Sequence, residues 1–125
     1  MKIFACLLLI ISGASAAQKL DTSAIITACS TVPRLYSVAS LAAFDSDDGQ
    51  WRKSTYQVAS ELMIGNKEAD RIIDSLRNNK DIARRFASSG AGQAGPEFMN
   101  DCITEPSKYI PSYERLLRAG KLTSH

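Results

Sequence analysis

The sequence predicts an all-α fold: one small domain with five to six short helices around a long, kinked N-terminal helix, closed by one disulfide. Three observations carry this prediction. Apolar residues recur at helical spacing, no segment has the alternating pattern of a strand, and two cysteines remain once an N-terminal leader is removed. The remaining chain, residues 17–125, is about 109 residues long, which suits a single domain.

The leader, residues 1–16, has the pattern of a cleaved signal peptide. Lys2 supplies a positive charge, nine apolar residues follow from Ile3 to Ile11, and small residues lead to a cleavage site after Ala16. As a helix the apolar run spans roughly 14 Å, less than half of a ~30 Å hydrocarbon core. A buried N-terminal helix is the alternative, but it would be uncapped. We therefore expect export to the periplasm or the extracellular space, without stable membrane insertion.

Export leaves two cysteines, because Cys6 is lost with the leader. In an oxidising compartment the simplest state of the pair is a disulfide between Cys29 and Cys102. In the chain-entropy model a loop of this length, 74 positions counting both cysteines, is worth about 4.5 kcal/mol. Two free thiols or a redox pair are the alternatives, although no Cys-x-x-Cys spacing supports redox chemistry.

A long helix is predicted from Asp21 to Asp45, with Asp21 as its N-cap. One face carries an apolar stripe at i, i+3, i+4 spacing: Ile25, Ala28, Cys29, Val32, Leu35, Tyr36, Ala39, Ala42 and Ala43. Pro33 removes one backbone donor but does not shift the phase of the stripe. The segment is therefore one kinked helix or two helices nearly end to end, and Pro33 is expected to lie off the apolar face.

The acidic cluster at 45–49 is predicted to end this helix as a solvated loop. Three carboxylates and a glycine invite comparison with an EF-hand calcium loop. However, loop positions 5, 6 and 12 hold Gly49, Gln50 and Tyr56, where that loop needs an oxygen ligand, glycine and glutamate. No metal site is predicted there.

Three amphipathic helices follow, over 50–64, 67–77 and 80–88, with Gly65 just past the end of the first and Asn66 capping the second. They carry the densest basic group of the chain: Arg71, Arg77, Lys80, Arg84 and Arg85. Interleaved acids neutralise part of this group, as Asp81 would do for Arg85 at i, i+4. The group is either a solvated helical surface or a docking patch for an acidic partner.

Residues 88–95, SSGAGQAG, contain a literal G-x-G-x-x-G at Gly90, Gly92 and Gly95. A dinucleotide site needs this motif between a strand and a helix, but here a helix precedes it, so we expect a flexible loop and no cofactor. Pro96 is predicted to open the next helix, which runs to about Thr104.

That helix turns Cys102 toward the core, and Pro106 closes it. Pro111 then opens the last helix, Gly120 lies past its end, and Leu122 folds back on it.

The residues for common catalytic sites are missing. The one histidine, His125, is the C-terminal residue, so no histidine is placed to activate a nucleophile, and no cysteine–histidine cluster has zinc spacing. Nothing selects a glycosidase-type carboxylate pair from the acids present. Without Lys2 the chain has 14 basic and 13 acidic residues, too balanced for a nucleic-acid-binding protein. The sequence therefore predicts no catalytic, cofactor or metal site.

Two function classes remain. The favoured one is an exported protein-binding module, such as an inhibitor, an immunity factor or an accessory subunit, whose helical face presents aromatic and arginine side chains. The alternative is a carrier of a small apolar ligand. The large apolar residues that would wall its cavity, or else form an ordinary core, are Trp51, Met63, Phe86, Phe98 and Met99.

Overall fold

The structure, a computed structural model, describes residues 19–45, 49–88 and 95–124. The predicted signal peptide lies outside these residues, as do positions 46–48 of the acidic loop and 89–94 of the glycine loop. Within the described residues the fold is all-α, as predicted. The helices are α2 (Thr22–Phe44), α3 (Gly49–Glu61), α4 (Asn66–Arg77), α5 (Lys80–Ser88), α6 (Pro96–Thr104), α7 (Pro106–Tyr109) and α8 (Tyr113–Arg118).

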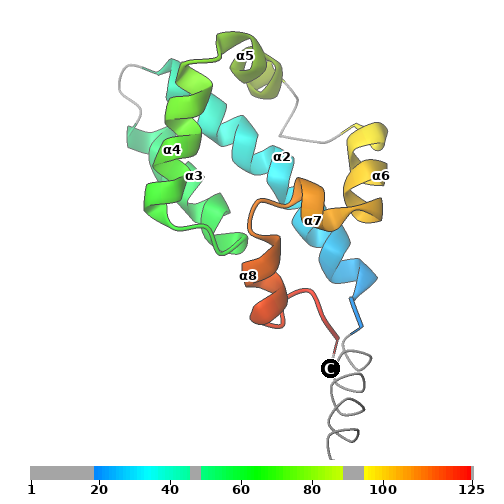
Figure 1. Cartoon of the computed structure of the whole chain (residues 1–125). Helices are drawn as coiled ribbons and strands as arrows, with labels where there is room; N and C mark the ends of the chain where they lie inside the picture. Colours follow the sequence, from blue (N-terminus) through cyan, green and yellow to red (C-terminus); the bar gives the residue numbers. More distant parts are fainter. Residues whose placement is uncertain (1–18, 46–48, 89–94, 125) are drawn as a thin grey trace, which may run out of the picture.

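Helix α2 crosses the centre of the molecule, with α3 and α4 on one side, α6 on the other, α5 near its C-terminal end, and α7 and α8 beside its N-terminal half (Figure 1). The long helix supplies the surface on which the short helices pack. This arrangement follows from its stripe, because no other helix has enough apolar length to bury so many partners.

Asp21 caps α2 as predicted: its carboxylate accepts a hydrogen bond from the backbone N–H of Ser23, with 3.0 Å between Oδ1 and N. The helix continues through Pro33 as a single element. The expectation that Pro33 lies off the apolar face was wrong, since its side chain is buried. The reason is that helices pack on several sides of α2. The same packing buries polar residues outside the stripe: Thr31, Ser37 and Ser40.

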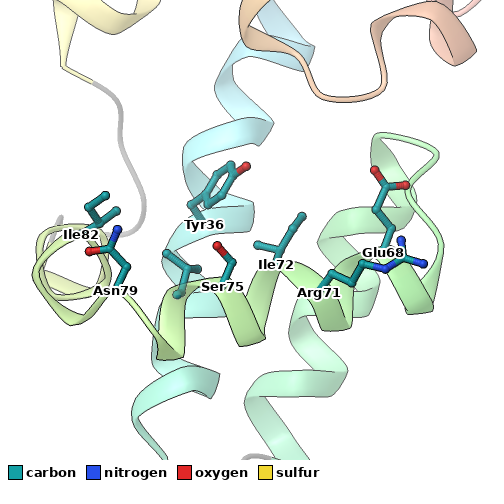
Figure 2. A pocket seen from close by; sticks show the side chains of 8 residues that line it. Tyr36, Glu68, Arg71, Ile72, Ser75, Asn79 and Ile82 are labelled. Carbon is teal, nitrogen blue, oxygen red and sulfur yellow. The ribbon is translucent and has the colours of Figure 1, made fainter.

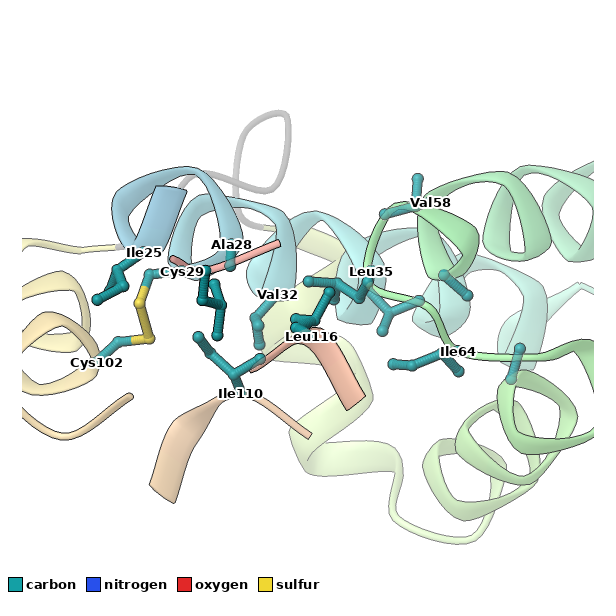
Figure 3. Close-up of a cluster of buried hydrophobic side chains, with 14 residues drawn as sticks. Ile25, Ala28, Cys29, Val32, Leu35, Val58, Ile64, Cys102, Ile110 and Leu116 are labelled. Atoms are coloured by element: carbon teal, nitrogen blue, oxygen red, sulfur yellow. A yellow bond between two sulfur atoms is a disulfide. The ribbon is translucent and has the colours of Figure 1, made fainter. Parts of the chain in front are cut away.

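The predicted disulfide joins α2 to α6: Cys29 and Cys102 are bonded, with an S–S distance of 2.09 Å, and both residues are fully buried. The bridge lies at one end of the main core (Figure 3). Apolar residues from α2, the α3–α4 turn and the C-terminal segments extend the core away from it, among them Val32, Leu35 and Ile110. A smaller cluster packs between α2, α4 and α5.

The turn between α3 and α4 differs from the prediction. Helix α3 ends at Glu61, and Met63, not Gly65, takes the left-handed conformation with φ of 58°. Gly65 is instead the N-cap of α4, with φ of −78°. The turn is a Schellman motif, in which the N–H of Ile64 bonds to the carbonyl of Ala59 at 2.9 Å. Burial of Ile64 explains the shift, because the chain must reverse two residues earlier to place that side chain in the core.

The C-terminal segment contains one helix that was not predicted, α7 (Pro106–Tyr109), and its last helix begins at Tyr113 rather than at Pro111. Gly120 follows that helix with φ of 74°, as expected for a C′ glycine. Leu122 folds back and is buried, and its carbonyl accepts a 2.8 Å hydrogen bond from the N–H of Asp21. The two ends of the described chain therefore close on each other.

By length and composition α2 would also suit a membrane-spanning helix. In the fold, however, 56% of its most apolar window is buried inside the protein. Packing against the other helices accounts for the same composition.

Candidate functional site

Two open clefts lie against the middle of α2 and meet at Tyr36 and Ile82. The first cleft, about 340 Å³, lies between α2, α4 and α5. Tyr36 projects into it from α2, with Glu68 and Arg71 toward one end and Asn79 and Ile82 toward the other (Figure 2). Ile72, Ser75 and Leu76 complete its lining.

The second cleft, about 420 Å³, lies between α2, α5, α6 and α7. It is lined mainly by apolar and aromatic side chains, and two of its lining residues are cationic. The lining residues are Val32, Pro33, Tyr36, Ile82, Arg85, Phe86, Gly95, Phe98, Lys108 and Tyr109.

Four aromatic rings form the walls of the second cleft as two packed pairs. Tyr36 stacks on Phe86 across α2 and α5, with centroids 5.2 Å apart and planes at 26°. Phe98 meets Tyr109 edge to face across α6 and α7, at 5.8 Å and 84°. Such pairs contribute beyond their buried area, so the rings hold each other in place. The walls of the cleft are therefore ordered before any ligand binds.

The charge at the second cleft is positive. Arg85 and Lys108 line it, and no carboxylate is among the described residues of its lining. Within the described chain, neither cation forms an ion pair. Lys108 instead places its Nζ 5.5 Å from the ring centre of Tyr109, a cation–π contact. An apolar cleft that has two cations and no carboxylate among its described lining residues is suited to a ligand with an anionic group.

Tyr36 places a hydroxyl between the two clefts. Burial raises the pKa of Tyr36 above its usual value of 10.0, and the negative charge of Glu68 raises it further. Glu68 is itself held by Arg115, with 2.9 Å between Nη2 and Oε1. Tyr36 forms no hydrogen bond from its hydroxyl to another described residue, so a protonated donor faces the first cleft (Figure 2).

Two residues of the predicted basic group are engaged within the fold. Arg77 donates to the carbonyls of Ala42 and Ala43 at 3.3 and 3.4 Å, and so caps the C-terminal end of α2. Arg84 pairs with Asp81 at 3.4 Å and lies over the ring of Phe44, 6.0 Å from its centre.

The other three residues of the group lie at the surface. Arg71 lines the first cleft and Arg85 the second, while Lys80 opens α5 at the surface. All three are exposed and lack ion pairs with other described residues. The structure thus divides the basic group between helix capping and an open surface.

Of the large apolar residues considered for a cavity wall, Phe86 and Phe98 line the second cleft. Trp51 packs on the smaller core cluster, Met99 packs on the main one, and Met63 is 39% exposed in its turn.

Sequence reasoning did not identify Tyr36, Ile82, Lys108 or Tyr109 as site residues. Tyr36 was assigned to the apolar stripe of the first helix, and no role was predicted for Lys108 or Tyr109, which lie between Pro106, predicted to close one helix, and Pro111, predicted to open the last. The signal that was present is an adjacent cation and aromatic residue in that proline-bounded segment.

Among the described residues, no group of three or more histidine, cysteine, aspartate or glutamate side chains is arranged to hold a metal ion. The chain matches no family model, and neither curated proteins nor solved structures contain a significant match to it. The features of the described chain that could bind another molecule are the two clefts and the surface around α5.

Proposed function

We propose that this chain is an exported, non-enzymatic protein-binding module that acts on another protein in the periplasm or outside the cell, as an inhibitor, immunity factor or accessory protein. The observation that carries the proposal is the surface around α5, where unpaired cations adjoin exposed apolar side chains. Phe44, the last residue of α2, lies beside Arg84 of α5, and Ile82 is part of α5; the two apolar residues are 44% and 39% exposed. Arginine and apolar anchors of this kind are typical of binding hot spots.

We name this surface the docking face and define it by Arg71, Lys80, Ile82 and Arg85. Its three cations have no ion-pair partner among the described residues, which favours a partner with an acidic surface. Ile82 lies where the two clefts meet, so an apolar side chain of the partner would pack beside it. The docking face rests on a rigid support, because α5 packs on α2 and α2 is bridged to α6.

Charge reversal at the docking face tests the proposal. The tagged wild-type protein, incubated with extract of the native source under oxidising conditions, should retain a partner that elutes with salt. Arg71→Glu/Lys80→Glu should lose it. The matched control, Lys53→Glu/Arg118→Glu, changes charge by the same amount on exposed parts of α3 and α8 and should retain it. Equal retention by all three proteins would contradict the proposal.

A second candidate function, carriage of a small apolar ligand, is supported by the size and lining of the second cleft. Small-molecule sites commonly have volumes of roughly 300–1,000 Å³, with mostly apolar walls and few polar groups. The value of about 420 Å³ falls in this range. Stoichiometric uptake of an apolar ligand, with unfolding still cooperative, would favour this candidate over the first.

A further inference from the structure

We propose that the second cleft binds an amphiphile with an apolar body and a single carboxylate, the body between the aromatic walls and the carboxylate at Arg85 and Lys108. The proposal rests on the second candidate function, ligand carriage, and adds the chemical class of the ligand.

The walls of the second cleft favour an apolar body. The lining residues that carry no charge are almost all apolar or aromatic, and they come from four helices. Each methylene removed from water into such walls strengthens binding about fourfold. A chain of eight to ten carbons is therefore enough for measurable affinity.

The two cations of the lining favour a carboxylate on the ligand. Arg85 reaches the cleft from α5 and Lys108 from α7, so a carboxylate at this rim meets cations from two different elements. A guanidinium binds a carboxylate through two parallel hydrogen bonds, while an ammonium adds a point charge. A cationic amphiphile would meet two like charges without a compensating acid among the described lining residues.

The site is also held in shape without a ligand. Helix α6, which carries Phe98, is bridged to α2 through Cys102, and α2 carries Tyr36 of the opposite wall. A preformed cleft spends less of its binding energy on ordering side chains.

The test is isothermal titration calorimetry of the full folded chain with three probes of equal chain length: decanoate, decanol and decyltrimethylammonium. Decanoate should bind with one-to-one stoichiometry, more tightly than decanol, and decyltrimethylammonium should bind most weakly. Shortening decanoate to octanoate should weaken binding about tenfold to twentyfold, as two methylenes require. Amide chemical shifts on adding decanoate should change most around Phe86 and Tyr109.

Single substitutions at the two cations test where the carboxylate of decanoate binds. Arg85→Gln and Lys108→Gln should each weaken decanoate binding about twofold to fivefold, within the range for an exposed charge pair, and change decanol binding less than 1.5-fold. Arg118→Gln, an exposed arginine on α8 away from the cleft, should change neither.

A second pair of variants replaces the apolar side chain of Ile82 by a side chain of negative or of positive charge. Ile82 is exposed enough to be replaced without loss of folding. Ile82→Glu should bind decanoate at least fivefold more weakly than Ile82→Lys.

Failure of this inference is distinguishable from failure of ligand carriage. Equal binding of decanoate and decanol in the second cleft would leave carriage standing and overturn the carboxylate. Binding of none of the probes would overturn both. Shifts confined to another surface would also refute the assignment of the second cleft.

Discussion

In the turn between α3 and α4, the residue in the left-handed conformation is Met63, while the glycine of the turn lies two residues later, and this leads to a quantitative prediction. Met63 has φ of 58°, in the left-handed region, while Gly65, two residues later, has φ of −78°. A side chain in the left-handed region crowds the following carbonyl, and only glycine avoids that cost. We therefore expect Met63→Gly to stabilise the protein.

The magnitude follows from opposing contributions. Relief of left-handed strain at Met63 is worth about 1–2 kcal/mol. Glycine adds freedom to the unfolded chain, which costs about 0.5–1 kcal/mol. Loss of side-chain packing is small because Met63 is 39% exposed, so the net gain should be about 0.5–1 kcal/mol.

Urea unfolding followed by circular dichroism measures this gain as a higher midpoint at unchanged slope. Met63→Ala is the matched control, because it removes the same long side chain and retains the strain of a Cβ. The alanine variant should be no more stable than the wild type. Equal stabilisation by both variants, or destabilisation by Met63→Gly, would refute the reasoning.

Three further predictions concern stability. Replacing both Cys29 and Cys102 by alanine should cost about 4 kcal/mol, since their bridge spans a separation of 73 residues, and unchanged urea unfolding would contradict this. Ser40→Ala should raise the unfolding free energy by about 1 kcal/mol, because the buried Ser40 hydroxyl has no hydrogen-bond partner among described residues. Burial, and then the charge of Glu68, raise the pKa of Tyr36 in the folded protein above its usual value of 10.0. As pH rises past 10, Tyr36 therefore loses its proton in the unfolded chain before it does so in the folded protein. The stability that this proton contributes below pH 10 should consequently fall as pH rises above 10. Tyr36→Phe should make that decline shallower in pH-dependent unfolding.

Periodicity and end signals were enough to predict several helices. The helices over 80–88 and 96–104 begin and end where the sequence indicated, because Lys80 follows a pair of asparagines and Pro96 occupies a first-turn position. The disulfide was predictable because only two cysteines remain once the predicted leader is removed, and each of them lies on an apolar face. The helix signals are local, and the tertiary fold did not change them.

The α3–α4 turn was mispredicted because its deciding interaction is not local. A glycine near the end of an apolar stripe normally marks the left-handed position, which made Gly65 the natural choice. The burial of Ile64 determines where the chain reverses, and that depends on the position of the core relative to the turn. The short α7 was missed for a similar reason, since four residues are too few to show a period.

The clefts were harder to predict than the helices. Phe86 and Phe98 were considered as wall residues, but Tyr36 was assigned to the core because it shares the stripe of Leu35. Whether a stripe residue is covered depends on where the neighbouring helices stop, and α5, α6 and α7 leave Tyr36 partly open. Sequence likewise shows which residues are charged, but it does not show that Arg77 reaches the end of α2.

The same helix therefore provides both the stability of the fold and the floor of the proposed site. Through Cys29, α2 holds α6 in place, and through Tyr36 it contributes to both clefts. The two roles belong to different residues of α2, because its fully buried stripe fixes the fold while the half-buried Tyr36 lines the clefts. Substitutions at Arg85 or Lys108 should consequently change binding without changing stability, whereas substitutions at Leu35, which is fully buried, should do the reverse.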